Sequence, residues 1–153
     1  MFLELFNKLN IDSFPIRKRI EAMEWFLRQQ PYAITDAEEY GYQDELINGL
    51  YYRKIKVRAG DLIIGLVHKK PHDCFLLSGT ASILSEDVSF NATTPLAFKA
   101  GANTKKIGYA HTEFEFMTVH KTNKKYKEDV RLEIFEESDL HWCDQHLVLE
   151  NLQ

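Results

Sequence analysis

The sequence predicts a mainly β protein, folded as one small barrel or sandwich behind a helical N-terminal stretch. Short runs of β-branched and aromatic residues, separated by turn residues, recur at roughly ten-residue spacing from Tyr51 to about His120. The chain has 153 residues, of which 44% are hydrophobic and 12% aromatic, enough to bury the core of one domain. This composition excludes wholesale disorder.

The charge balance argues against a dedicated binder of duplex nucleic acid. The chain carries 19 basic and 23 acidic residues, a net charge of −4 and an isoelectric point near 5.9, whereas a duplex binder normally presents a net basic face. The two cysteines, Cys74 and Cys143, lie far apart, so a disulfide framework is not expected and a reducing compartment or a virion interior suits the chain. No apolar run approaches the roughly 20 residues that span a bilayer, and the first residues lack the features of a secretory signal.

Residues 1–46 are predicted to form a helical extension and a linker. Ser13 can cap a helix that has Pro15 in its first turn and ends before Pro31. The apolar residues of this helix recur at i, i+4, i+7 and i+11 and therefore share one face: Ile16, Ile20, Met23 and Leu27.

Residues 32–50 show no clear period and are predicted to be the linker, with Asn48-Gly49 as a turn just before the strands. The first strand then alternates, so that Arg53 and Ile55 share one face. The predicted strands cover residues 51–57, 62–68, 72–77, 81–84, 95–99, 106–109 and 114–120.

The predicted barrel spans residues 47–137, and residues 138–153 form a C-terminal arm. Residues 121–127 are a basic loop, and residues 128–137 are compatible with either a strand or a helix. The arm contains apolar residues with nothing local to bury them: Leu140, Trp142, Leu147 and Leu149. We expect the arm to dock on the barrel or on a neighbouring copy, which favours a homo-oligomer, most simply a dimer.

The spacing of residues 60–79 resembles the first cupin motif, Gly-x5-His-x-His-x(3,4)-Glu-x6-Gly. Gly60 and Gly79 occupy the two glycine positions, and His68 occupies the second histidine position. Leu66 stands where the first histidine would be, and His72 stands where the glutamate would be. In cupins the polar residues of this motif bind a divalent metal inside a β-barrel, so two of three ligand types are changed here.

The second cupin motif, Pro-x-Gly-x2-His-x3-Asn, resembles the stretch from Lys99 to Gly108. Gly101 matches the motif, but Thr104 stands where the last metal-binding histidine would be. A complete cupin metal site is therefore not expected.

Residues 47–135 also resemble a group of small cupin-like proteins common in bacteriophage genomes. The shared residues are Gly49, Leu50, Tyr51, Arg53, Gly65, His68, His72, Ser78, Gly79, Pro95, Gly101, Lys106, Gly108, Tyr109, Ala110, Thr118, Val119 and His120. The resemblance implies a cupin-like jelly-roll β-barrel with an N-terminal helical extension and a C-terminal arm. It also implies the host cytoplasm or the virion as the location.

Strand parity assembles a candidate pocket inside this barrel. His68, His72 and His120 come from different strands, and each shares a face with apolar residues, as does Arg53. A one-residue slip in register would reverse these faces. The predicted ligand-binding residues are Arg53, His68, His72, Lys106, Tyr109 and His120.

Three interpretations of this pocket remain open. His68, His72 and His120 could bind Zn, Fe or Mn as neutral imidazoles, leaving one position for water. The same residues could instead line a site for a small anionic ligand, with the arginine supplying a fork of donors. In the third interpretation the barrel is simply filled, Arg53 pairs with a buried acid and the histidines satisfy backbone groups.

These interpretations correspond to three functions. The leading one is a non-enzymatic bacteriophage accessory protein whose barrel binds a small ligand or a protein partner. The alternatives are a virion structural or decoration protein and a metal-dependent cupin enzyme, such as a dioxygenase or isomerase.

Overall fold

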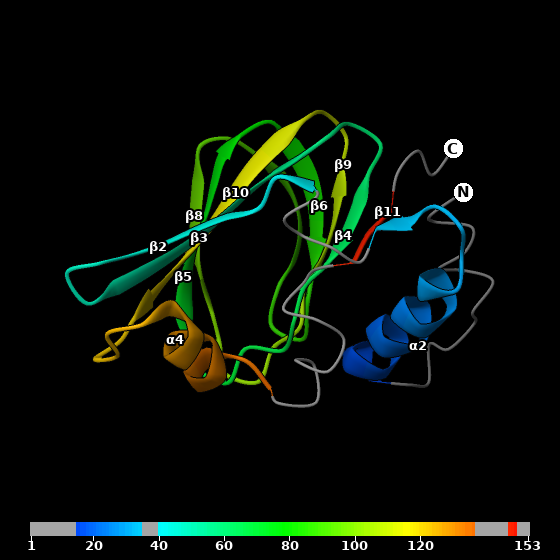
Figure 1. The fold of residues 1–153 in the computed structure, drawn as a ribbon. Helices are drawn as coiled ribbons and strands as arrows, with labels where there is room; N and C mark the ends of the chain where they lie inside the picture. The colour runs from blue at the N-terminus through cyan, green and yellow to red at the C-terminus, as the bar shows by residue number, and fades with distance from the viewer. Residues whose placement is uncertain (1–14, 35–39, 137–146, 150–153) are drawn as a thin grey trace.

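Two antiparallel sheets face each other and enclose the core, as Figure 1 shows for the computed structural model, which describes residues 15–34, 40–136 and 147–149. The six-stranded sheet has the order β1 (Ala33–Ile34), β11 (Leu147–Leu149), β4 (Leu62–Ile64), β9 (Ile107–Ala110), β6 (Thr80–Leu84) and β7 (Ser89–Thr93). The five-stranded sheet has the order β2 (Gln43–Ile47), β3 (Leu50–Val57), β10 (Phe114–Lys121), β5 (His72–Ser78) and β8 (Leu96–Ala100). The mainly β, jelly-roll class predicted from the sequence is confirmed.

The inner faces of the two sheets carry the residues that strand parity predicted. β10 pairs with β3 so that Thr118 lies opposite Arg53 and Phe116 lies opposite Ile55. Because side chains alternate along a strand, these four point to the same side of the sheet. The core between the sheets is built from Ile55, Val57, Leu76, Ala81, Ile83, Ala110 and Phe114.

Part of the predicted linker is a strand. Gln43–Ile47 form β2, which is joined to β3 by the predicted turn, where Asn48 and Gly49 adopt φ values of 52° and 77°. These positive values are those of a hairpin turn with Asn-Gly at its centre. β2 is an edge strand in which Gln43, Glu45 and Ile47 are exposed and no residue is fully buried, so its sequence gives little hydrophobic signal.

The strand predicted over residues 62–68 is shorter than expected, since β4 ends at Ile64. The chain then leaves the regular ladder, and His68 makes only isolated bridges to Thr104 and Phe135. β7 was not expected from the sequence.

Helix α2 (Ile16–Arg28) covers the outer face of the six-stranded sheet (Figure 1). Its predicted apolar face is confirmed, since Ile20, Met23 and Leu27 are buried against the outward side chains of β4 and β9. An ion pair of 2.8 Å between Glu24 and the buried Lys105 fastens the helix to the barrel. The proposed cap Ser13 lies outside the described residues.

Helix α4 (Lys127–Ile134) closes one end of the barrel and settles the alternative left open for residues 128–137. Val130, Ile134 and Phe135 pack there against Tyr51 and Leu66. In the described part of the chain, no helix is both long and apolar enough to cross a membrane. Most of the predicted C-terminal arm lies outside the described residues, but its residues 147–149 pair with β4 as β11.

An acidic side chain on β2 ties this helix to the sheet. Tyr51 Oη donates to Asp44 Oδ2 at 2.6 Å, Lys127 Nζ donates to Asp44 Oδ1 at 3.2 Å, and Arg131 Nη2 donates to Asp44 Oδ2 at 3.2 Å. Burial raises the pKa of Asp44, but these hydrogen bonds and the nearby positive charges outweigh burial and hold the pKa below its ordinary value.

We expect Asp44→Asn to lower the free energy of unfolding at pH 7 by about 1–3 kcal/mol, because it removes the charged acceptor of three donors. A carboxyl group with a lowered native pKa stabilises the fold above its unfolded pKa, and this stabilisation is lost as the pH falls through the native value. The difference between variant and parent, measured by urea denaturation, should therefore shrink between pH 5 and pH 2. Glu45→Gln on the exposed side of the same strand should change stability by less than about 0.5 kcal/mol. Equal losses in both variants would contradict this role of Asp44.

Candidate functional site

Arg53 is the central residue of the candidate site. It is 4% exposed, and its guanidinium carbon lies 4.5 Å from the ring centre of Tyr42 and 4.2 Å from that of Phe135. Each of these rings therefore turns a face toward the cation, which is a favourable cation–π arrangement. None of the three guanidinium nitrogens has a hydrogen-bond partner among the described residues.

An arginine in this setting is unusual, because buried charges are normally paired. Burial lowers the pKa of Arg53, and nearby Tyr42 and Tyr51 oppose that change, but a guanidinium remains charged in proteins. The interpretation in which Arg53 pairs with a buried acid is not supported by the described residues. Leaving such donors unsatisfied costs about 1–3 kcal/mol for a neutral group and more for a charged one.

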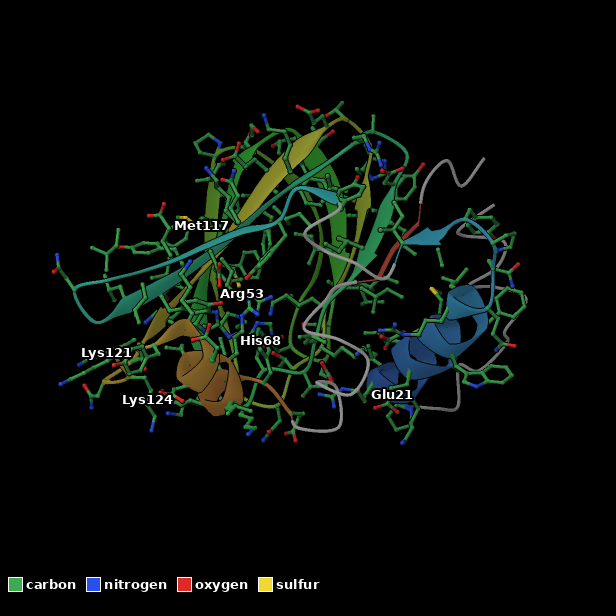
Figure 2. All side chains as sticks on the ribbon, in the orientation of Figure 1. Glu21, Arg53, His68, Met117, Lys121 and Lys124 are labelled. Atoms are coloured by element: carbon green, nitrogen blue, oxygen red, sulfur yellow. The ribbon has the colours of Figure 1, made fainter. Side chains whose placement is uncertain are left out.

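Three imidazoles lie beside this guanidinium (Figure 2 labels Arg53 and His68). The ring centres of His68 and His72 are 4.1 Å apart, those of His72 and His120 4.8 Å, and those of His68 and His120 5.4 Å. The planes of the three rings are nearly parallel, with interplanar angles of 23°, 25° and 2° respectively. This stack confirms the prediction that the three histidines come together from separate parts of the chain.

The imidazoles are neutral. Burial, then the charge of Lys106, lowers the pKa of His68 well below its ordinary value and that of His72 to about 4. Burial, then the neighbouring His72 and Arg53, lowers the pKa of His120 to about 2. Adding a proton to any ring would place another positive charge beside a cation in a low-dielectric interior.

Lys106 supplies a second buried cation. It is 8% exposed, and its Nζ lies 2.9 Å from His72 Nε2. His72 Nδ1 lies 3.1 Å from the carbonyl oxygen of Lys70, so Nδ1 carries the proton and Nε2 accepts from the lysine. Burial lowers the pKa of Lys106, and the charges of Asp87 and Glu86 oppose that change, although no carboxylate among the described residues forms an ion pair with it.

A cavity of about 60 Å³ lies between the two sheets, next to Arg53, His68 and Lys106. Its polar end is formed by Arg53, His68, Lys106 and Thr118. The remaining inward side chains are mostly apolar and include Ile55, Ile63, Ile83, Phe114 and Phe116. This volume exceeds the roughly 10–15 Å³ that a cavity needs to hold one water, so the cavity has room for a small molecule.

These residues do not fit a divalent metal in this arrangement. Ligating imidazoles must direct in-plane lone pairs at one point about 2.0–2.1 Å away, whereas these rings present their faces to one another. His72 Nε2 is occupied by Lys106, and the two cations would repel a further positive charge. Among the described residues, no group of three or more His, Cys, Asp or Glu side chains is arranged to hold a metal ion. We therefore assign no metal to His68, His72 and His120.

The structure brings five of the six predicted ligand-binding residues together and places one elsewhere. Arg53, His68 and Lys106 line the cavity, while His72 and His120 lie behind them. Tyr109 belongs to the opposite face of β9, where it packs near α2 and meets His111 edge-on. The physical reason is alternation, because Lys106 and Tyr109 are three residues apart in the chain and so point to opposite sides.

Sequence reasoning missed three residues of the site. Tyr42 stands just before β2 in the supposed linker, and Phe135 follows α4, so neither belongs to a periodic run. Thr118 lies two residues before His120 in a predicted strand, so alternation puts both on one face, and the register sets Thr118 across from Arg53. That shared face was the sequence signal from which Thr118 could have been found.

Searches with this sequence found no matching family model and no matching curated protein. Solved structures with a similar fold include a cupin-2 domain protein from Shewanella frigidimarina, at 12% identity and a TM-score of 0.44, covering 54% of this chain and 80% of that one. A cupin superfamily protein from Desulfitobacterium hafniense is 11% identical with a TM-score of 0.45, covering 72% and 90%. Ectoine synthase from P. lautus is 13% identical with a TM-score of 0.47, covering 65% and 84%. Likeness at this level concerns the fold alone.

Neutral buried imidazoles should make the protein less stable as the pH falls from about 6.5 to 4. Their native pKa values are lowered, so the unfolded state binds more protons in this window and stability rises with pH. His120→Gln should reduce the slope of unfolding free energy against pH by up to about 1.4 kcal/mol per pH unit. Lys121→Gln, a change at the next and exposed position, should leave the slope unchanged. Denaturant unfolding at half-unit pH intervals would test this, and an unaltered slope in the His120 variant would contradict it.

Proposed function

We propose that this protein is a non-enzymatic, ligand-binding protein whose barrel holds a small anion between Arg53 and Lys106. The carrying observation is the buried guanidinium of Arg53, which faces a cavity and has no hydrogen-bond acceptor among the described residues. An anion would supply the missing acceptor, and the planar guanidinium suits a carboxylate or phosphate.

The charge of the site supports an anion over a neutral or cationic ligand. Arg53 and Lys106 are both buried cations lining one cavity, and the adjacent imidazoles are neutral. Neither cation is paired with a carboxylate within the described ranges. A bound anion would offset positive charge that no ion pair neutralises, in a region where solvent screens it weakly.

Binding is favoured over turnover by what the lining groups offer. The guanidinium and the ammonium are hydrogen-bond donors that can hold an anion in place, whereas the Thr118 hydroxyl is hydrogen-bonded to His120 Nε2 at 3.0 Å. The imidazoles are engaged, since His68 Nδ1 donates to the Leu66 carbonyl oxygen at 3.0 Å and His72 is held on both sides. In the setting implied by the resemblance to phage cupin-like proteins, this would be an accessory protein.

Arg53→Met should raise the midpoint of thermal unfolding without ligand, because it removes a desolvated charge and keeps an apolar stem between two rings. The same variant should lose the stabilisation that small anions give the parent protein. At a ligand concentration of one hundred Kd this stabilisation is about 2.7 kcal/mol, or roughly 5–10 °C. Thermal unfolding with sodium acetate, propionate, butyrate, phosphate and sulfate at constant ionic strength measures both effects.

Lys56→Met is the matched control, since Lys56 lies on the same strand with its side chain toward solvent. This variant should respond to anions as the parent does. The proposal fails if no anion stabilises the parent protein, or if Arg53→Met retains the full response.

A further inference from the structure

The inner wall of the barrel changes character sharply along β3 and β10. Arg53 and Thr118 form one cross-strand pair, and Ile55 and Phe116 form the next inward pair. The strand rise of about 3.3 Å per residue separates these pairs by roughly 6–7 Å. A ligand whose charged end is held by the guanidinium would therefore contact the apolar side chains of Ile55 and Phe116 one cross-strand pair further along.

The six-stranded sheet, which forms the opposite wall of the cavity, leaves space beside Gly108. Gly108 on β9 lies between Ile63 of β4 and Ile83 of β6 in the ladder, and all three line the cavity. A Cβ atom added to Gly108 would stand 3.4 Å from Ile63 Cγ2 and 3.6 Å from Phe114 Cζ. The absence of a side chain at this glycine thus leaves room for about one further carbon atom against apolar neighbours.

The donors lie at one end of the cavity, and this arrangement suits a carboxylate better than phosphate or sulfate. Phosphate and sulfate carry oxygens on all sides, so some of them would face Ile55, Ile63 and Phe116 without donors, which is costly. A carboxylate has both oxygens at one end and can direct them to Arg53 and Lys106. Its hydrocarbon chain would then lie in the apolar part of the cavity.

We infer that the ligand is a short aliphatic monocarboxylate, with its carboxylate between Arg53 and Lys106 and its chain directed toward Gly108. This inference rests on the anion-binding function proposed above and names its ligand class. The small cavity volume, about 60 Å³, favours short-chain acids such as acetate, propionate or butyrate over long-chain ones.

Calorimetric titration of the full chain with acetate, propionate, butyrate, hexanoate, phosphate and sulfate tests the ligand class. Affinity should rise about fourfold for each methylene group from acetate to butyrate, because each buried methylene gains hydrophobic transfer energy. It should fall at hexanoate, whose chain exceeds the cavity. Butyramide, which has the same shape without the charge, should bind at least tenfold more weakly than butyrate.

Gly108→Ala tests the position of the chain. Gly108 has a backbone conformation open to other residues, and the added methyl group meets only ordinary contacts, so the fold should be retained. The variant should bind acetate as the parent does but bind butyrate at least fivefold more weakly. Ala97→Val, which adds carbon atoms at an exposed position of β8, should leave the whole series unchanged.

The outcomes separate the two proposals. If phosphate or sulfate binds as tightly as the best carboxylate, or if affinity is independent of chain length, the inference is overturned while anion binding stands. If Gly108→Ala weakens all carboxylates equally, the chain does not point toward that glycine and the inference is likewise overturned. If no anion binds at all, the proposed function itself falls.

Discussion

The buried guanidinium of Arg53 contacts two aromatic rings and has no acceptor among the described residues. The arrangement of the side chains at this end of the barrel depends on it. Tyr42 and Phe135 can reach Arg53 only because β2 and α4 close over the same edge of the five-stranded sheet. Asp44 holds these two elements together through Tyr51 and the cations of α4. The two rings stabilise the charge by cation–π attraction but do not satisfy its donors. Unsatisfied donors on a buried charge are costly, and an anion would supply the acceptors that they lack.

The imidazole stack follows from the same charge. Protonation of His72 or His120 would add positive charge next to Lys106 and Arg53, so both rings stay neutral over the physiological pH range. Neutral rings pack face to face and accept hydrogen bonds, as His72 does from Lys106. Two side chains, Arg53 and Lys106, therefore make the polar end of the cavity positively charged, and the three neutral imidazoles pack beside them.

Two of the three residues that differ from the motifs this sequence resembles have clear structural partners. Leu66, at a histidine position of the first motif, packs in the apolar cluster with Phe135 under α4. Thr104, at the histidine position of the second motif, donates its hydroxyl hydrogen to the Gly101 carbonyl oxygen. The third, His72, belongs to the imidazole stack and accepts a hydrogen bond from Lys106.

The sequence by itself determined the local features: the face of each long strand, the Asn48-Gly49 turn and the apolar face of α2. These features depend on periods of two or 3.6 residues and on backbone preferences within a few positions, so they can be read without the fold. Only the tertiary structure decided that Tyr42 and Phe135 enclose Arg53, that residues 147–149 join the six-stranded sheet, and that Tyr109 faces α2. The reason is that such contacts join segments tens of residues apart, and strand pairing across the barrel, which no local period encodes, sets which side chains meet.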